Sequence, residues 1–328
     1  MKKKTALGLG VFALGLLIAG HASAANEYSA LLKDRKFAEV EKASAAKLAR
    51  DPADADAMIA RTVAILGARD GRYEEAAAQA EKCIAKHPGN GGCHVALGKA
   101  LGSKAMAGGI SSALGYAGTI RDSFKKAVEL DPRDFDARFS LLDYYMMAPF
   151  IVGGGTGKAQ ALARDTAAIN AEAGKLMTAH LDLKEDDLAK AEAAALAIRP
   201  GSDDDLQQRH ENLLIALGST HLGAKKYGDA ARLFGEAQKR YPDSPSVGFM
   251  SARLHQEQGK HREAVAILEQ VLVKMPQPHV HYRIGKSLQA MGDKAKATAA
   301  FEKALSFKAG LPKTQRADAE EQLKALRS

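Results

Sequence analysis

Small and large apolar residues recur in a fixed order along residues 211–310, with a period of about 34 residues. Three successive units carry an alanine, and a large apolar residue follows four positions later, at Phe234, Leu268 and Phe301. The first half of each unit has another small residue at an equivalent place, at Gly218, Ala252 and Gly285. Small residues at fixed positions let two helices pack closely. The pattern therefore predicts stacked pairs of antiparallel helices.

This order of residues resembles the tetratricopeptide repeat (TPR) family, in which proline follows the second helix of each pair. Prolines stand at the ends of units at Pro88, Pro132, Pro242 and Pro276. Proline cannot continue a helix, so each one marks the end of a pair. The resemblance covers residues 25–328 and is strongest over 211–310. It implies an all-α fold, a right-handed superhelical solenoid of about seven antiparallel helix pairs.

Two Gly-rich stretches interrupt the repeats, at 102–118 and at 148–157. Each is expected to lengthen the turn between the two helices of a pair, and the two pairs follow one another. The stretches should therefore lie side by side on one edge of the solenoid. Long loops of this kind either pack on each other or form a lip that covers a ligand. A charged, amphipathic segment at 313–327 is expected to be the polar capping helix that a solenoid end needs.

The first 24 residues have the character of a secretory signal peptide. Three lysines precede an apolar run of about fifteen residues, and Ala22 and Ala24 form a small-x-small cleavage signal. The run is shorter than the ~20 residues that a membrane-spanning helix needs. We therefore expect export to the periplasm or the outside of a bacterial cell. Residues 25–328 would then form the mature solenoid, with no membrane span.

Composition narrows the fold class and the possible partners. Alanine makes up about a fifth of the chain, aromatic residues are 5%, and there is no Trp. This composition favours closely packed helices and excludes an all-β fold. The formal net charge of +8 falls to +5 when the three lysines of residues 1–24 are removed. Because no dense basic run is present, a nucleic-acid partner is not expected.

Cys83 and Cys93 are the only two cysteines of the chain. They flank the turn between the second helix of one pair and the first helix of the next, where two Cα atoms can come within bridging range. An exported protein meets an oxidising compartment, which favours a disulfide between them. The alternative is that both are small buried residues, since Cys83 occupies a repeat position that requires a small side chain.

Motifs for metal, nucleotide or covalent chemistry are not found. The histidines His255, His261, His279 and His281 lack carboxylate or cysteine support at metal-ligand spacing. The glycines before Lys158 do not have the spacing of a phosphate-binding loop. No catalytic nucleophile or zinc-peptidase motif appears. We therefore expect neither a metal nor a cofactor, and no enzymatic activity.

In TPR proteins the first helices of the pairs line a concave groove, and one stripe of each helix faces it. The stripe of the last two pairs carries Phe249, Arg253, Gln256, His279, Tyr282, Lys286 and Gln289. Phe139 and Asp143 fall at the same places upstream, and Arg61 and Lys99 at related ones. Aromatic and basic side chains suit a protein or peptide partner with carboxylates. The alternative is an ordinary solvated helix face.

These observations favour a non-catalytic protein–protein interaction scaffold of the bacterial cell envelope, with the partner in the concave groove. The rival interpretation is a small-molecule or glycan binder at the Gly-rich lip of 102–118 and 148–157.

Overall fold

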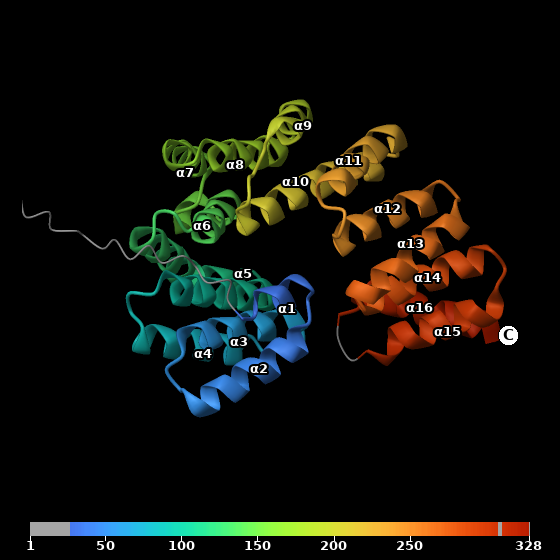
Figure 1. Cartoon of the computed structure of the whole chain (residues 1–328), viewed down its shortest axis with the longest axis horizontal. Helices are drawn as coiled ribbons and strands as arrows, with labels where there is room; N and C mark the ends of the chain where they lie inside the picture. Colours follow the sequence, from blue (N-terminus) through green and yellow to red (C-terminus); the bar gives the residue numbers. More distant parts are fainter. Residues whose placement is uncertain (1–26, 308–309, 328) are drawn as a thin grey trace, which may run out of the picture.

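The computed structural model describes residues 27–307 and 310–327 and folds them into α-helices joined by short turns (Figure 1). The expected signal peptide, 1–24, lies outside the described residues. The elements in chain order are α1 Ser29–Lys33, α2 Phe37–Arg50, α3 Ala55–Ala68, α4 Tyr73–Lys86, α5 Gly91–Leu130, α6 Phe135–Met147, the 3₁₀ turn η1 Phe150–Val152, α7 Thr156–Ile169, α8 Ala171–Lys184, α9 Leu188–Ala197, α10 Asp204–Gly223, α11 Tyr227–Arg240, α12 Pro245–Glu257, α13 His261–Lys274, α14 Pro278–Ala290, α15 Lys294–Ser306 and α16 Lys313–Arg327.

Consecutive helices pack as antiparallel pairs, and the pairs stack into an all-α solenoid. The described residues form eight pairs, where the sequence predicted about seven, followed by α16. α5 is itself a pair, because Gly109 (φ 76°, ψ −167°) turns the chain back on itself. Among these residues, none of the helices combines the length and the apolar character that crossing a bilayer would require.

Glycines in the first helices lie directly under aromatic rings of the second helices. A Cβ atom added to Gly98, Gly218 or Gly285 would lie 2.3 to 2.8 Å from the ring of Phe124, Phe234 or Phe301. No larger side chain fits there without separating the two helices. The small positions of the repeat pattern therefore have the packing role that the sequence predicted.

Aspartates in the turns between pairs fix where each first helix begins. Asp54, Asp134 and Asp203 occupy N-cap positions, and each carboxylate accepts a hydrogen bond from the backbone N–H three residues later, at 2.8 to 2.9 Å. Such caps satisfy N–H groups that have no partner within the helix. The turns are thus short and well defined, which holds successive pairs at a regular offset.

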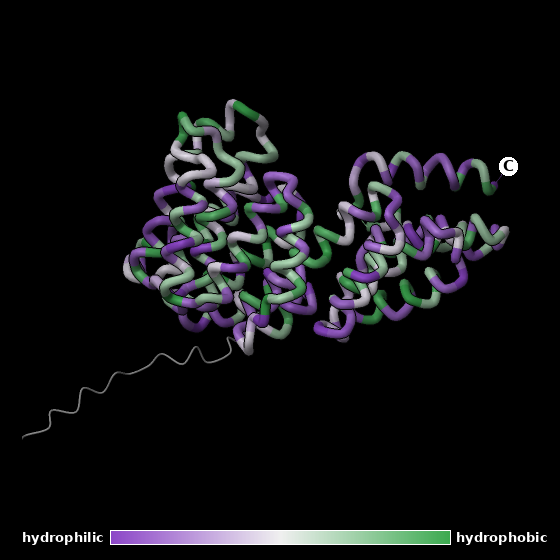
Figure 2. The backbone as a smooth tube through the Cα atoms, turned by 90° about the horizontal axis from the view of Figure 1, so that it is seen from above, coloured by the Kyte–Doolittle hydropathy of each residue, from purple (hydrophilic) through white to green (hydrophobic). Residues whose placement is uncertain are grey.

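The stacked pairs curve around a central space. In Figure 1, α6, α10, α12 and α14 follow one side of it, and α1 and α3 lie opposite. Figure 2 shows the helices near the C terminus as a lobe that is set apart from the larger body. We call α1 to α5 the N-terminal arm and α12 to α16 the C-terminal arm.

Cys83 at the end of α4 and Cys93 in the first turn of α5 form a disulfide, with Cα atoms 5.5 Å apart. Both side chains are fully buried beside Met58. The bridge therefore ties two successive pairs of the N-terminal arm together.

The two Gly-rich stretches differ from the expected loops. Residues 102–118 are helical and lengthen both halves of α5, so that the α5 hairpin extends beyond its neighbours. Within 148–157 the chain forms η1 and then starts α7. Arg121 of α5 donates a hydrogen bond to the carbonyl oxygen of Val152 at 3.4 Å. Residues 148–157 therefore contact the α5 hairpin just beyond 102–118, and the side-by-side placement of the two stretches themselves stays a prediction.

Candidate functional site

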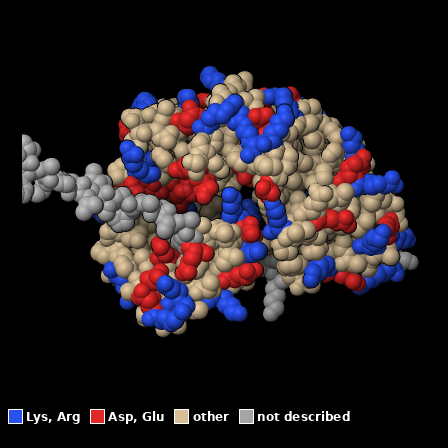
Figure 3. All heavy atoms as spheres, viewed as in Figure 1, with Lys and Arg blue, Asp and Glu red and all other residues tan. Residues whose placement is uncertain are grey.

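A hollow lies between the two arms, and charged side chains surround it. Figure 3 shows acidic side chains along one wall of this hollow, and lysines and arginines inside it and at its mouth. The first helices of the pairs provide these side chains. We refer to this surface as the groove, and it divides into a central region on α5, α6 and α10 and a junction between the two arms.

The central region is held by Arg209 of α10. Its guanidinium donates to the carboxylates of Asp143 at 2.9 Å and Asp136 at 3.3 Å, both on α6. The ammonium group of Lys99 on α5 also contacts Asp136, at 2.5 Å. Burial alone would raise the pKa of Asp136, but Lys99 and Arg209 outweigh it and hold that pKa below its ordinary value. The charges of this region are thus satisfied within the protein.

Phe139 and His180 lie beneath this network. The Phe139 ring is fully buried, 5.0 Å from the Arg209 guanidinium and 5.9 Å from the His180 ring. Burial lowers the pKa of His180 to about 4, and its Nε2 atom has no hydrogen-bond partner among the described residues. The expectation that Phe139 lines the groove as a contact residue is wrong, because Arg209 covers it.

A carboxylate on the acidic wall is electrostatically strained. Asp205 lies in the first turn of α10, and desolvation together with the nearby Asp136 and Asp203 raises its pKa to about 6, although its side chain is exposed to solvent. Carboxylates close to one another disfavour each other's charged forms. The start of α10 thus gives this side of the groove a local excess of acidic groups.

The junction has the opposite character. Arg35 and Arg69 of the N-terminal arm and Arg283 of the C-terminal arm lie within electrostatic range of His279, and Arg253 lies within range of Arg283. We call these five residues the basic cluster. None of the four arginines forms an ion pair within the described part of the chain. The nearest compensating groups are Glu211, which acts on Arg35, and Glu257, which acts on Arg253.

The pKa shifts indicate that members of the cluster lie within electrostatic range of one another. Burial and Arg69 lower the pKa of Arg35, and burial and Arg283 lower that of Arg253. Burial, together with Arg35, Arg69 and Arg283, lowers the pKa of His279 to about 4. Like charges within electrostatic range destabilise one another. The cluster is therefore a concentration of positive charge that the fold itself does not neutralise.

Arg35 and Arg69 occupy turns where the backbone is left-handed, with φ of 55° and 53°. Arg35 stands two residues before a second helix, where other turns have Asp186, Lys225, Gly259 or Gly292, all with positive φ. The turn of Arg69 has its own glycine at that place, Gly71, with φ of 87°. The left-handed conformation is thus a common property of these turns and does not by itself mark a functional site.

Other residues of the predicted stripe complete the junction. Phe249 meets the His279 ring edge to face at 4.9 Å. Gln256 donates to the Ser287 hydroxyl at 2.6 Å and to the Arg283 carbonyl oxygen at 2.8 Å, which fixes α12 against α14. The Nε atom of Arg253 is buried and has no partner, while its Nη1 faces the Met250 sulfur at 3.6 Å.

The last three residues of the stripe contact α16. The Tyr282 hydroxyl donates to Asp318 at 2.7 Å, Lys286 contacts the same carboxylate at 3.3 Å, and Gln289 donates to Gln322 at 2.7 Å. Tyr282 is only 8% exposed. The expectation that Tyr282 faces a partner is therefore wrong, because the capping helix covers it, whereas Lys286 and Gln289 pair with α16 but stay partly exposed, so that their role in binding stays a prediction.

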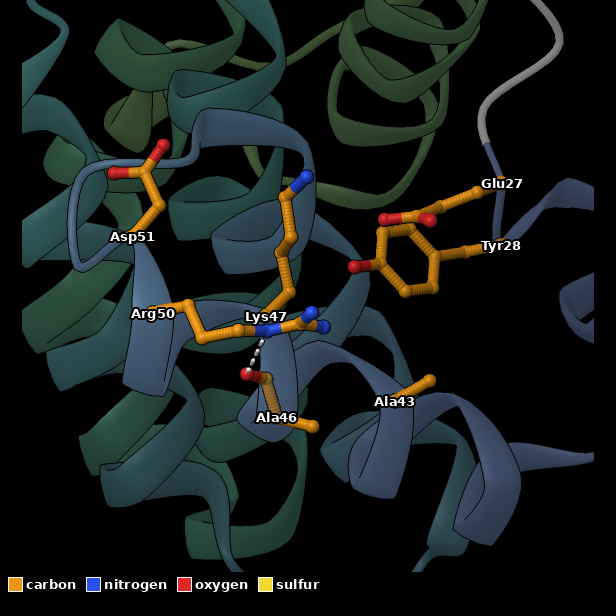
Figure 4. Close-up of a pocket in the computed structure, with 7 residues that line it drawn as sticks. All are labelled: Glu27, Tyr28, Ala43, Ala46, Lys47, Arg50 and Asp51. Atoms are coloured by element: carbon orange, nitrogen blue, oxygen red, sulfur yellow. Dashed lines mark hydrogen bonds between the residues drawn. The ribbon is translucent and has the colours of Figure 1, made fainter.

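Two open pockets lie at the ends of the described chain, away from the groove. Figure 4 shows the first, of about 530 Å³, where Arg50 donates to the Ala46 carbonyl oxygen at 3.3 Å. Its lining residues are Glu27, Tyr28, Ala43, Ala46, Lys47, Arg50 and Asp51. The second lies between α15 and α16 and includes Leu305 and Leu323. Neither contains residues of both arms, so the basic cluster remains the stronger candidate.

Sequence reasoning identified Arg253, His279 and Phe249 but missed Arg35, Arg69, Arg209 and Arg283. The local sequence carries no distinct signal for Arg35, because other repeats have Asp186, Lys225 or glycine at the same place of the turn. Nothing in the local pattern shows that these turns face α14.

Comparison with known proteins supports the repeat assignment. Residues 221–290 and 278–310 match two family models, each described as a tetratricopeptide repeat. No curated protein sequence matches this chain.

Solved structures with a similar fold include yeast Tom70, at 11% identity and a TM-score of 0.60, covering 90% of this chain and 59% of Tom70. A chain of the APC/C hetero-tetramer Cut9-Hcn1 has 15% identity and a TM-score of 0.47, covering 92% and 54%. A tetratricopeptide repeat protein from Parabacteroides merdae has 14% identity and a TM-score of 0.43, covering 93% and 97%. The chain thus spans little more than half of the first two. These identities show a shared fold alone.

Proposed function

Because this chain is a TPR-repeat protein, we propose that it is a non-catalytic interaction scaffold whose groove binds an acidic segment of another protein. The observation that carries the proposal is the basic cluster at the junction. Four arginines converge there without ion pairs, whereas Arg209 in the same groove has two carboxylate partners. Unpaired arginines are strong donors to carboxylates and common anchors of interface energy.

The shape of the junction supports a peptide more than a small ligand. The cluster combines residues of α3, α12 and α14 with the turn after α1, so a ligand must bridge the two arms to contact all of it. Phe249 offers an aromatic surface beside His279. The carboxylates around Asp205 at the start of α10 disfavour an acidic segment there, whereas Asp136 is already paired with Lys99 and Arg209.

The setting that we propose is the bacterial cell envelope, on the strength of residues 1–24. The purified exported protein should begin at Ala25, which N-terminal sequencing would show. Retention of Met1 on the exported protein would contradict this part of the proposal and leave the groove argument untouched.

The rival function, a glycan or small-molecule site at the Gly-rich lip, has less support. The exposed side chains there are mainly apolar, including Ile110, Phe150 and Ile151. A glycan site needs several converging polar groups around a concavity.

The test uses a fluorescein-labelled oligo-glutamate peptide and an oligo-lysine peptide of the same length, with fluorescence anisotropy as the readout. Wild type should bind the acidic peptide and not the basic one. The R253A/R283A double variant should lose about ten-fold in affinity, because both side chains are direct donors. Arg262→Ala is the matched control, since Arg262 is exposed on α13 outside the junction. Equal affinity of the double variant and wild type would refute the proposal.

A further inference from the structure

Large apolar side chains gather on one edge of the solenoid, where the α5 hairpin and η1 lie next to each other. Met106, Ile110 and Leu114 at the hairpin tip are 71%, 83% and 48% exposed. Met147, Phe150 and Ile151 around η1 are 64%, 82% and 82% exposed. We call these six residues the apolar lip. Within the described ranges, they are six of the eight large hydrophobic residues that stand exposed.

Two side chains donate hydrogen bonds to the main chain of η1. The Tyr144 hydroxyl donates to the Val152 carbonyl oxygen at 2.6 Å, and Arg121 donates to the same oxygen at 3.4 Å. These bonds hold the η1 part of the lip against α5 and α6. Exposed apolar patches of this kind mark an interaction surface.

Part of the main chain of the lip is hydrogen-bonded internally. In the α5 hairpin the backbone is helical on both sides of Gly109. Around η1 the N–H groups of Gly153, Gly154 and Gly155 donate to the carbonyl oxygens of Phe150, Pro149 and Tyr145 at 2.8 to 3.1 Å. Each paired N–H group lowers the cost of leaving water.

The charged side chains in the chain segments that form the lip are all basic. Residues 82–121 and 144–164 contain no Asp or Glu, while Lys104, Arg121 and Lys158 flank the apolar side chains. The nearby carboxylates are Glu74 and Asp122, which pair with Lys104 and Arg121. Tyr116, Tyr144 and Tyr145 lie at the base of the tips, and tyrosine is typical of the water–lipid boundary.

We propose that the apolar lip inserts into the surface of an anionic lipid bilayer. The two tips enter the boundary between headgroups and acyl chains, and the basic residues behind them contact lipid phosphates. A protein partner would need polar groups at the rim for hydrogen bonding, and the Gly- and Ala-rich tips offer few. The lip is separate from the basic cluster, so lipid binding and peptide binding are independent properties.

Sedimentation with vesicles tests this, using the purified exported protein and variants that share its N terminus. Wild type should pellet with mixed phosphatidylglycerol and phosphatidylcholine vesicles and much less with pure phosphatidylcholine. The I110S/F150S/I151S triple variant should lose about ten-fold in partitioning. The three side chains are exposed, so circular dichroism should show an unchanged fold. Val273→Ser is the matched control, since Val273 is 83% exposed on α13.

Three results would overturn the proposal. The first is no binding of wild type to either vesicle, and the second is equal binding of wild type and the triple variant. The third is a wild-type dimer in sedimentation velocity that the triple variant abolishes, which would make the lip a contact between two copies of the chain. R253A/R283A should bind vesicles as wild type does, and its failure would assign lipid binding to the groove instead.

Discussion

Arginines occupy two regions of the same groove, and their surroundings differ. In the central region Arg209 has two carboxylate partners and lies over a buried aromatic ring. At the junction, Arg35, Arg69, Arg253 and Arg283 approach one another without a carboxylate within ion-pair distance on the described chain. The same residue type thus stabilises the fold in one place and leaves charge available in the other. Pairing, more than residue type, thus distinguishes the charges that stabilise this fold from those left available for the proposed binding.

The largest expected effect comes from breaking the paired region. Arg209→Ala leaves Asp136 and Asp143 facing each other and uncovers the Phe139 ring. We expect the free energy of unfolding to fall by about 2 kcal/mol, after allowance for the partial exposure of the carboxylates. Urea denaturation would measure it, with Arg253→Ala as the comparison. If Arg253→Ala destabilises the protein as much as Arg209→Ala, the distinction between the two regions is lost.

The second prediction separates stability from binding at the junction. The R35G/R69G variant removes two charges and relieves two left-handed residues, so it should be more stable than wild type by about 1 kcal/mol. Its affinity for oligo-glutamate should nevertheless fall about three-fold. Thermal unfolding and anisotropy would measure the two quantities. A variant that is less stable and binds equally well would show that both arginines are structural.

The third prediction concerns a variant in which Arg209 loses its carboxylate partners and becomes unpaired, like the arginines of the junction. The D136N/D143N variant removes the partners of Arg209 while keeping the side-chain shapes. Acidic peptide affinity should rise about three-fold, because Arg209 and Lys99 become available. The E320Q/E321Q variant removes two charges from the exposed face of α16 and is the charge-matched control. An equal rise in both variants would mean that net charge alone controls the affinity.

The smallest effect concerns His180 and His279, whose pKa values are both lowered to about 4 mainly by burial, with Arg35, Arg69 and Arg283 adding to the shift at His279. Their unfolded pKa is near 6.5, so the unfolded state binds more protons between pH 6.5 and 4. The stability that their neutral forms contribute is complete above pH 6.5 and is lost as pH falls toward 4.

Bound oligo-glutamate should raise the pKa of His279, since it neutralises Arg35, Arg69 and Arg283. It should leave the pKa of His180 unchanged, because burial dominates there. Imidazole NMR titrations with and without the peptide would show this. An unchanged His279 in the saturated complex would place the peptide elsewhere.

The repeat architecture was predictable because its signals are local. Gly218 and Gly285 lie under the rings of Phe234 and Phe301, and these contacts join helices that are adjacent in sequence. The Gly-rich stretch 102–118 was harder to interpret. It suggested a loop, yet its Ala, Ser and Leu residues continue the helix on both sides of Gly109.

The site was predictable only in part, because it depends on distant packing. Phe249, Arg253 and His279 follow from helical periodicity within the repeats. Tyr282 fits the same periodicity, but the orientation of α16, which covers it, has no local signal. Arg69 comes near His279 because each helix pair between them is rotated relative to the one before, and these rotations add up. A short stretch of sequence does not reveal their sum.

That summation has a mechanical consequence. Within the described residues no hydrogen bond joins the two arms at the junction, and the core cluster that reaches from α3 to α12 runs through the stacked pairs between them. The separation of the arms is therefore set by the stack. A rotation of a few degrees at one contact between pairs displaces His279 by a distance that grows with its separation from that contact. Gly174 is such a pivot, because an added Cβ atom would lie 2.4 Å from that of Ala167. A larger side chain at Gly174 would separate these two helices and change the distance between the arms, without altering any residue at the junction.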